Sequence, residues 1–394
     1  MAVRNRFAEL LPEITGWRHD FHQHPELMYE VHRTAAKVAA LCQSFGCDEV
    51  VTGIGRTGVV ALIHGRTQAS GRVVGLRADM DALPIHEITG AAYASKTEGA
   101  MHACGHDGHT AILLGAAKYL AETRQFDGTV ALIFQPAEEG GAGGKAMVDD
   151  GMMDRFGIQE VYGLHNAPGL GIGQFAIRAG ALMASADEFT IRLTGRGGHA
   201  AEPHLAIDTT LVGCHIVVAL QSVVARSINP LDSVVVTVGT FKTDSNASNV
   251  IANQVVMEGT VRTLADGARD TAEARLRAIV AATAEAFGAS VEIDYERGYP
   301  VTVNTPEHTA YAIAAAESVV GRAAVDANTP PIMPAEDFSY MLQARPGAYI
   351  FLGNGDSAGC HHPAYDFNDE ALPVGCSFFV NLVEQRMPLG ETQR

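Results

Sequence analysis

The sequence predicts an α/β fold: a mostly parallel sheet with helices on both faces, interrupted by an inserted ferredoxin-like α+β domain. Two patterns predict it. Apolar, β-rich runs alternate with helical patterns over most of the chain. In the middle of the chain, apolar and polar residues instead alternate within strands, as they do in an antiparallel sheet with one exposed face. The length of 394 residues also exceeds what one simple core holds, which favours two domains.

Four β-rich runs are expected to form the parallel sheet, at 73–78, 129–134, 160–164 and 348–352. Acidic or histidine residues follow each run, namely Asp81, then Glu138 and Glu139, then His165, then His361. In open α/β sheets, ligands bind beyond the carboxyl ends of the strands. If the four strands are parallel neighbours, these side chains converge on one edge of the sheet.

The middle of the chain reads as strand, helix, strand, strand, helix, strand, which is the ferredoxin-like order. The expected strands are 188–194, 234–240, 254–262 and 290–295, and the expected helices are 206–226 and 266–287. We therefore place an inserted domain at 183–295, within a discontinuous catalytic domain made of 1–182 and 296–394.

Residues 101–110 bring Cys104, His106 and His109 within six positions, just before an expected helix at 108–123 that Asp107 could cap. Thiolate and imidazole are the ligands that hold zinc and similar ions. The alternative is a loop with solvated histidines and an incidental cysteine. The acidic and histidine residues at four strand ends favour a metal site.

The adjacent carboxylates of Glu138 and Glu139 could have two different roles. One carboxylate can bind a metal while the other takes a proton from a metal-activated water. One thiolate, two or three imidazoles and a carboxylate exceed what one tetrahedral ion needs. We therefore expect two ions, with Cys104 or a carboxylate shared between them.

Composition narrows the class of partner. The formal net charge of −17 argues against nucleic acid and acidic membrane surfaces, since both require a basic patch. Residues 1–20 contain no apolar run fit for a signal peptide, and no stretch of about 18 uncharged apolar residues follows. The six cysteines are scattered without a Cys-x-x-Cys pair. We expect a cytoplasmic protein with free thiols.

Two other patterns are set aside. The glycine-rich segment 140–145 fails as a phosphate loop, because Ala146 follows Lys145 where Ser or Thr should bind magnesium. His19, His22 and His24 near the end of the first helix are interpreted as exposed or packing residues rather than as metal ligands.

A series of motifs in the same order along nearly the whole chain resembles the M20 metallopeptidase superfamily. The nearest resemblance is to its aminoacylase and hippurate hydrolase branch, which includes plant auxin-conjugate hydrolases. The motifs are RADMDALP at 77–84, MHACGHDGH at 101–109, QPAEEG at 135–140, GLHN at 163–166, GRGGHA at 195–200, SNVI at 248–251, GTVR at 259–262, AEDF at 335–338 and HHPAYDFN at 361–368.

The resemblance implies roles for individual residues. The implied ligands of two metal ions are Cys104, His106, Glu139, His165 and His361. Glu138 matches the general base and acid, and Asp81 a nearby carboxylate that orients the ligands. In the inserted domain, His199 matches a histidine that stabilises the oxyanion, in its own subunit or across a dimer. Asn249 and Arg262 match positions that hold the substrate near its carboxylate.

One segment departs from the family pattern, which more often has Leu-His, then Ser or Asn, then Pro. Here the order is Cys360-His361-His362-Pro363. His361 is the ligand by position, and His362 is the alternative if the loop shifts.

The implied reaction is hydrolysis of the amide bond of an N-acyl amino acid, of N-acetyl or N-benzoyl (hippurate-like) type, to a carboxylic acid and a free amino acid. The resemblance implies two divalent ions per subunit (Zn, Mn, Co or Ni), a homodimer or higher homo-oligomer, and a lid and dimerisation role for the inserted domain. The alternatives are an N-acetyl-diaminopimelate-type deacetylase and a non-catalytic metal-containing binding protein. Glu138 favours an enzyme, since a binding protein needs no base.

Overall fold

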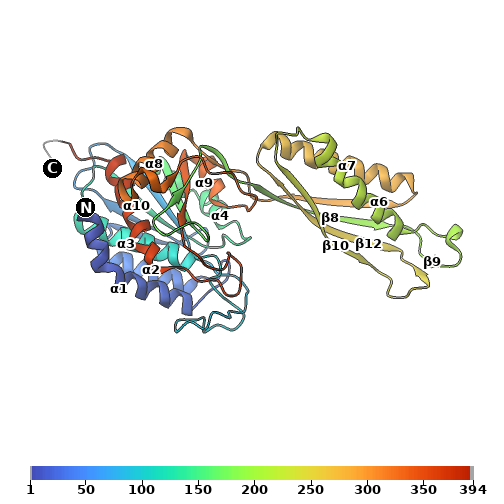
Figure 1. Cartoon of the computed structure of the whole chain (residues 1–394), viewed down its shortest axis with the longest axis horizontal. Helices are drawn as coiled ribbons and strands as arrows, with labels where there is room; N and C mark the ends of the chain where they lie inside the picture. Colours follow the sequence, from blue (N-terminus) through green and yellow to red (C-terminus); the bar gives the residue numbers. More distant parts are fainter. Residues whose placement is uncertain (1, 391–394) are drawn as a thin grey trace. The chain divides into compact units, whose positions relative to one another are not determined.

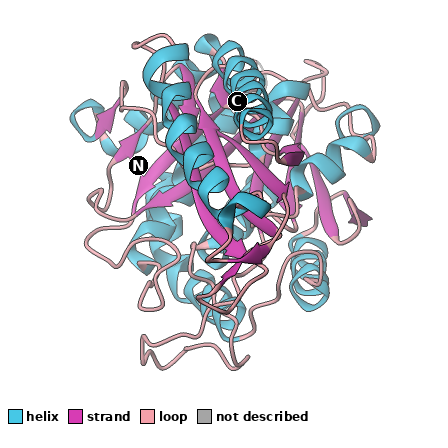
Figure 2. Ribbon diagram, turned by 90° about the vertical axis from the view of Figure 1, so that its right-hand side faces the viewer, coloured by secondary structure: helices cyan, strands magenta, loops and turns pink. Residues whose placement is uncertain are grey.

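The computed structural model describes residues 2–390 and divides the chain into two compact units (Figure 1). The larger unit consists of Met1–Gly180, Val303–Pro330 and Asp337–Arg394, and the smaller unit of Ala181–Thr302 and Pro331–Glu336. Figure 2 shows strands running between helices, as in an α/β protein. The segment Pro331–Glu336 belongs to the smaller unit because the amide of Ala184 donates to the carbonyls of Ile332 and Pro334, at 3.1 and 3.0 Å.

The larger unit contains an eight-stranded sheet in the order β1-β2-β4-β3-β5-β16-β6-β15. Its strands are β1 (Glu49–Ile54), β2 (Gly58–His64), β3 (Val73–Asp79), β4 (Thr129–Gln135), β5 (Glu160–Ala167), β6 (Phe175–Ala176), β15 (Val325–Asp326) and β16 (Gly347–Gly353). The four runs expected from the sequence are its central neighbours, and all three pairings among them are parallel. The mostly parallel sheet is therefore confirmed, while β1, β2 and β6 add antiparallel pairings.

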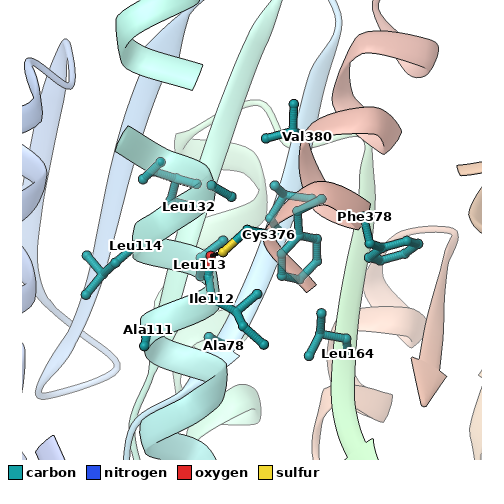
Figure 3. Packing of buried hydrophobic residues seen from close by; sticks show 14 of the residues in the cluster. Ala78, Ala111, Ile112, Leu113, Leu114, Leu132, Leu164, Cys376, Phe378 and Val380 are labelled. Carbon is teal, nitrogen blue, oxygen red and sulfur yellow. Dashed lines mark hydrogen bonds between the residues drawn. The ribbon is translucent and has the colours of Figure 1, made fainter. Parts of the chain in front are cut away.

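Helices of the larger unit pack around this sheet. They are α1 (Ala2–Gln23), α2 (His32–Phe45), α3 (His106–Thr123), α4 (Gly143–Asp149), α5 (Met152–Arg155), α8 (Pro306–Val320), α9 (Phe338–Ala344) and α10 (Leu372–Arg386). Ile112 of α3 and Phe378 of α10 lie with Ala78, Leu132 and Leu164 of three central strands in one buried apolar cluster (Figure 3). This packing holds α3 against the sheet and thereby fixes the place where its first turn begins.

The first turn of α3 corrects one prediction. The helix begins at His106, its N-cap is Gly105 in the left-handed region with φ +91°, and no side chain caps it. Asp107 instead lies inside the first turn. Its carboxylate accepts a hydrogen bond from Nδ1 of buried His22 at 2.9 Å and pairs with buried Arg18 at 3.3 Å. Asp107 therefore joins α3 to α1 rather than closing its own helix.

The smaller unit contains an antiparallel sheet in the order β10-β12-β8-β13. Its elements are β8 (Ser185–Thr194), β9 (Gly198–His199), α6 (Thr209–Ser222), β10 (Val234–Thr243), β11 (Val250–Ile251), β12 (Gln254–Thr263), α7 (Asp266–Ala286) and β13 (Ser290–Arg297). Short strands β7 (Gly180–Met183) and β14 (Thr302–Asn304) pair in a separate two-stranded sheet. The element order and strand order are those of the expected ferredoxin-like arrangement, and α6 and α7 cover one face (Figure 1).

Phe189, Ile191 and Leu193 of β8 are buried in one cluster with apolar residues of α6 and α7. The residues between them in β8 are exposed or half-buried. This alternation explains why the strand pattern of the sequence differs from that of the larger unit. By length and composition alone, the helical stretch Thr209–Ser227 could also cross a membrane, a property that core helices share.

Candidate metal centre

The five predicted ligands all lie in the larger unit, where strand ends and the start of α3 bring them together. Three overlapping groups have ligand atoms within 4.8 Å of one another: Cys104, His106 and His165; Cys104, Glu139 and His361; and His106, Glu138 and Glu139. His165 lies inside β5, which runs on to Ala167, rather than after the strand as expected. The convergence follows from the parallel order of the strands, because their carboxyl ends meet at one edge.

Backbone carbonyls orient two of the histidines. Nδ1 of His106 is 2.8 Å from the carbonyl oxygen of Asp81, and Nδ1 of His165 is 2.7 Å from that of Asn166. Since a carbonyl only accepts, each Nδ1 carries a proton, and in the neutral ring Nε2 then presents a lone pair. For His165, Nε2 lies 3.4 Å from Sγ of Cys104. This tautomer, held by an outer partner, is typical of histidines that bind metals.

His361 reaches the same place from the loop after β16. Its backbone amide donates to the carbonyl of Ala103 at 2.7 Å, and its Nε2 lies 3.3 Å from Oε1 of Glu139. Its φ of +65° is unusual for a residue other than glycine and aims the ring at this position. His362 instead accepts the amide of Ala364 at Nδ1, at 3.0 Å, and belongs to none of the groups. The geometry therefore favours His361 over His362.

Asp81 shapes the loop that carries both glutamates. It is buried, and its two carboxylate oxygens accept the backbone amides of Glu138 at 2.9 Å and Glu139 at 3.1 Å. Burial raises the pKa of Asp81. Asp81, which follows β3, thus fixes the backbone from which the side chains of Glu138 and Glu139 project. Glu138 itself is buried.

Acidic groups surround His106 in the centre. Burial alone would lower the pKa of His106, but the charges of Asp79, Glu139 and Asp81 outweigh burial and raise it well above its usual value. Burial opposes ionisation of Asp79 as well, yet the Arg77 guanidinium at 2.7 Å holds its pKa well below the usual range. Carboxylates held ionised around an imidazole favour a bound cation.

His109, the third residue of the 101–110 pattern, also has a ligand atom within 4.8 Å of those of Asp79 and His106, but its ring nitrogens already have protein partners. Its Nδ1 donates to Oδ1 of Asp79 at 2.7 Å, and its Nε2 accepts the backbone amide of Asn166 at 3.0 Å. Both nitrogens are therefore occupied, and the ring supports β3 and β5 beside the centre. The sequence analysis missed Asp79 in this position, although it ends β3 within the motif that also holds Asp81.

The remaining predicted residues lie in the smaller unit. His199 of β9 pairs with Val250 of β11, and the amide of Ala200 donates to the carbonyl of Asn249 at 3.0 Å, so His199 and Asn249 are neighbours. Nδ1 of His199 accepts the amide of Ala201 at 3.1 Å, and both His199 and Asn249 are exposed. Arg262 lies apart from them, half-buried on β12, where burial lowers its pKa.

The donor set fits divalent ions. Nε2 of His106 is buried and has no hydrogen-bond partner among residues 2–390, which is costly unless a ligand takes the lone pair. Thiolate, imidazole and carboxylate together are the donors that zinc and similar transition ions prefer. The α/β fold, this cluster and the second carboxylate of Glu138 beside it define a metal-dependent hydrolase.

Comparison with known proteins gives the family. Residues 75–385 match the model of peptidase family M20/M25/M40, and the chain belongs to this family. It is 39% identical over 374 residues to the hippurate hydrolase of Campylobacter jejuni, covering 95% of this chain and 96% of that protein. It is 39% identical over 379 residues to the N-acetyl-L-cysteine deacetylase of Bacillus subtilis, covering 95% of this chain and 88% of that protein.

Among solved structures, a dinuclear metal-binding peptidase of the M20 family from Bacillus subtilis superimposes with a TM-score of 0.83 at 32% identity. The match covers 96% of this chain and 99% of that one. The protein is thus a metal-dependent amidohydrolase of the M20 family that acts on a small-molecule amide.

Proposed function

We propose that this enzyme hydrolyses the amide bond of N-acyl amino acids, of N-acetyl or N-benzoyl type, with two divalent ions per subunit. The observation that carries the proposal is Glu138, a second buried carboxylate whose oxygen lies within 4.8 Å of ligand atoms of His106 and Glu139. The substrate class rests on the relatives, since hippurate is N-benzoylglycine and N-acetyl-L-cysteine is also an N-acyl amino acid.

Cys104, His106, Glu139, His165 and His361 would hold the two ions. Cys104 belongs both to the group with His106 and His165 and to the group with Glu139 and His361, which supports sharing of its sulfur between two ions. When bound, divalent ions polarise the acyl carbonyl and lower the pKa of water toward neutrality. The thiolate and imidazole donors suit Zn, Co or Ni, and the carboxylate donors also suit Mn.

Glu138 would take the proton from the attacking water and deliver it to the leaving amine. Asp81 holds the Glu138 amide and thereby positions this carboxylate. In the smaller unit, exposed His199 would donate to the oxyanion, while Asn249 and Arg262 would hold the substrate near its carboxylate.

The smaller unit is also proposed to act as lid and to form a homodimer. Helix α6 exposes Leu211 and Val218, with 49% and 72% of each residue accessible, and β10 is an edge strand of its sheet. Apolar side chains on one helix face, next to an open strand edge, fit a second copy of the chain. Sedimentation of the purified protein, compared with Val218→Glu, measures this directly; a monomer in both cases contradicts it.

The test of function is amine release from a panel of N-acyl amino acids. Metal-stripped protein is assayed alone and after addition of Zn²⁺, Mn²⁺, Co²⁺ or Ni²⁺. We expect release only after metal is restored, with N-acetyl and N-benzoyl amino acids preferred over N-acetyl-diaminopimelate. Preference for N-acetyl-diaminopimelate would favour the alternative function, an N-acetyl-diaminopimelate-type deacetylase. Folded, metal-loaded protein that releases no amine would favour a binding protein.

A further inference from the structure

A second cysteine lies against the metal centre without a part in the proposed reaction. Cys360 comes from the loop after β16 and directly precedes His361. The backbone amide of His361 donates to the carbonyl of Ala103 at 2.7 Å, which sets Cys360 opposite Cys104, and the neighbouring Cys360 side chain raises the pKa of Cys104. All six cysteines of the chain are free thiols, so both sulfurs are reduced.

The backbone around the two cysteines is held in place by hydrogen bonds. Next to each cysteine, the amide of His361 donates to the carbonyl of Ala103 at 2.7 Å. Buried Asn166 donates from Nδ2 to the carbonyl of Cys104 at 2.6 Å and accepts the hydroxyl of buried Tyr365 at 2.7 Å. Since the two loops are tied together on both sides of the pair, the sulfurs can bond without a large backbone movement.

The pair is within reach of a small oxidant. Cys104 is 8% exposed, whereas Cys360 is half-buried and is the sulfur that a small molecule meets. In a disulfide, Cys104 no longer has a thiolate that could bind a metal ion. Cys104 is common to two of the possible ligand groups, so both would lose a donor together.

We propose that Cys104 and Cys360 form a reversible disulfide on exposure to hydrogen peroxide, and that this modification expels the metal from the centre. The sulfur of Cys360 attacks the peroxide, the O–O bond breaks, and a sulfenic acid and water form. The sulfur of Cys104 then attacks the sulfenic sulfur, the S–O bond breaks, and a second water leaves as the disulfide forms. Two thiols are oxidised and one peroxide is reduced to two waters. A dithiol returns the two electrons.

Another pair of neighbouring thiols provides an internal control. Cys42 at the end of α2 and Cys47 just beyond it are also close together, since the amide of Cys47 donates to the carbonyl of Cys42 at 3.1 Å. Neither belongs to any of the groups that could hold a metal. Oxidation of this pair removes two thiols as well, but leaves every proposed ligand in place.

The test treats zinc-loaded protein with hydrogen peroxide and measures released zinc with a chromogenic chelator, together with peptide masses after digestion without reductant. We expect a peptide linking Cys104 to Cys360, lighter by the mass of two hydrogen atoms, and zinc release at the same rate. Dithiothreitol should reverse the link. In Cys360→Ser and in Cys360→Ala, zinc release should be at least about tenfold slower. In Cys47→Ser it should equal that of the wild type.

Three outcomes would overturn the proposal: no linked peptide at a peroxide dose that oxidises other thiols, equal zinc release in the wild type and both Cys360 variants, or a linked peptide with zinc retained. None of these readouts needs a substrate. A wrong assignment of the N-acyl amino acid would therefore leave the result unchanged.

Discussion

The two sheets of this molecule bury their strands differently, and the difference decides what each can hold. In β4 of the larger unit all seven residues are buried, whereas in β8 of the smaller unit buried positions alternate with more exposed ones. A strand covered on both faces can end in a dry edge where charged groups interact strongly. A strand with one open face presents its polar residues to water, where the same groups interact weakly.

The candidate residues follow this division. Arg77, Asp79 and His106 of the larger unit have fully buried side chains. Arg77 donates to Asp79 at 2.7 Å, and Nδ1 of His106 donates to the carbonyl of Asp81 at 2.8 Å. His199 and Asn249 of the smaller unit are exposed and held mainly through backbone pairing. Among residues 2–390, every possible metal group that contains histidine or cysteine draws all its members from the larger unit. In the proposed reaction, the larger unit would bind the ions and the smaller unit would contribute groups that act on the substrate.

Glu138→Gln tests this division most strongly. The amide keeps the shape of the side chain but cannot accept the proton, so we expect kcat to fall about 10³-fold. Metal content, measured by mass spectrometry of the dialysed protein, should stay unchanged because Glu138 is not a proposed ligand. Full turnover by this variant would contradict its role as the base.

His199→Ala should lower kcat a few hundred-fold, the usual cost of one oxyanion donor, without loss of metal. His204→Ala is the matched control, since His204 is exposed nearby in Pro203–Leu205 and has no proposed role. Steady-state kinetics on the best substrate of the panel measure both. Equal activity of the two variants would contradict a role of His199 in stabilising the oxyanion.

Cys104→Ala should weaken metal binding about 100-fold, because two ligand groups lose their common sulfur. Competition with a chelator measures the affinity. Cys214→Ala on α6 of the smaller unit removes an exposed thiol and should leave affinity unchanged. If the two substitutions act alike, the sulfur of Cys104 is not a ligand.

His22→Gln probes a buried ion pair of the larger unit whose acidic partner, Asp107, directly follows the proposed ligand His106. Burial would lower the pKa of His22, but Asp107 and Glu87 raise it to about 9. A pKa raised on folding stabilises the protein fully below about pH 6.5, and the effect is lost as the pH rises through 9. We expect the variant to be less stable by about 2 kcal/mol at pH 6, with the difference shrinking by pH 10.

Urea unfolding of the wild type and of His22→Gln at both pH values measures this difference. His32→Gln is the control, since His32 is exposed beside Glu30, where an ion pair contributes little. A stability difference for His22→Gln that is the same at pH 6 and pH 10 would show that His22 contributes packing rather than charge.

Much of the fold could be predicted from local patterns. Continuous apolar runs marked the four central strands, and alternation marked the antiparallel strands of the smaller unit, because burial on one face or on two leaves a direct trace in the sequence. The same runs predicted the convergence of Asp81, Glu138, Glu139, His165 and His361, since parallel strands end on one edge. The family motifs then supplied the expected chemistry.

Only the tertiary structure decided which partners the polar groups find. His106 and His109 are neighbours in the sequence, yet one presents a free Nε2 and the other has both nitrogens bound to Asp79 and Asn166. Asp107 pairs with His22 across two helices instead of capping its own, and Cys104 meets Cys360 across two loops. A periodic pattern shows which face of an element is buried. The direction of a hydrogen bond depends on atoms that distant parts of the chain bring within about 3 Å.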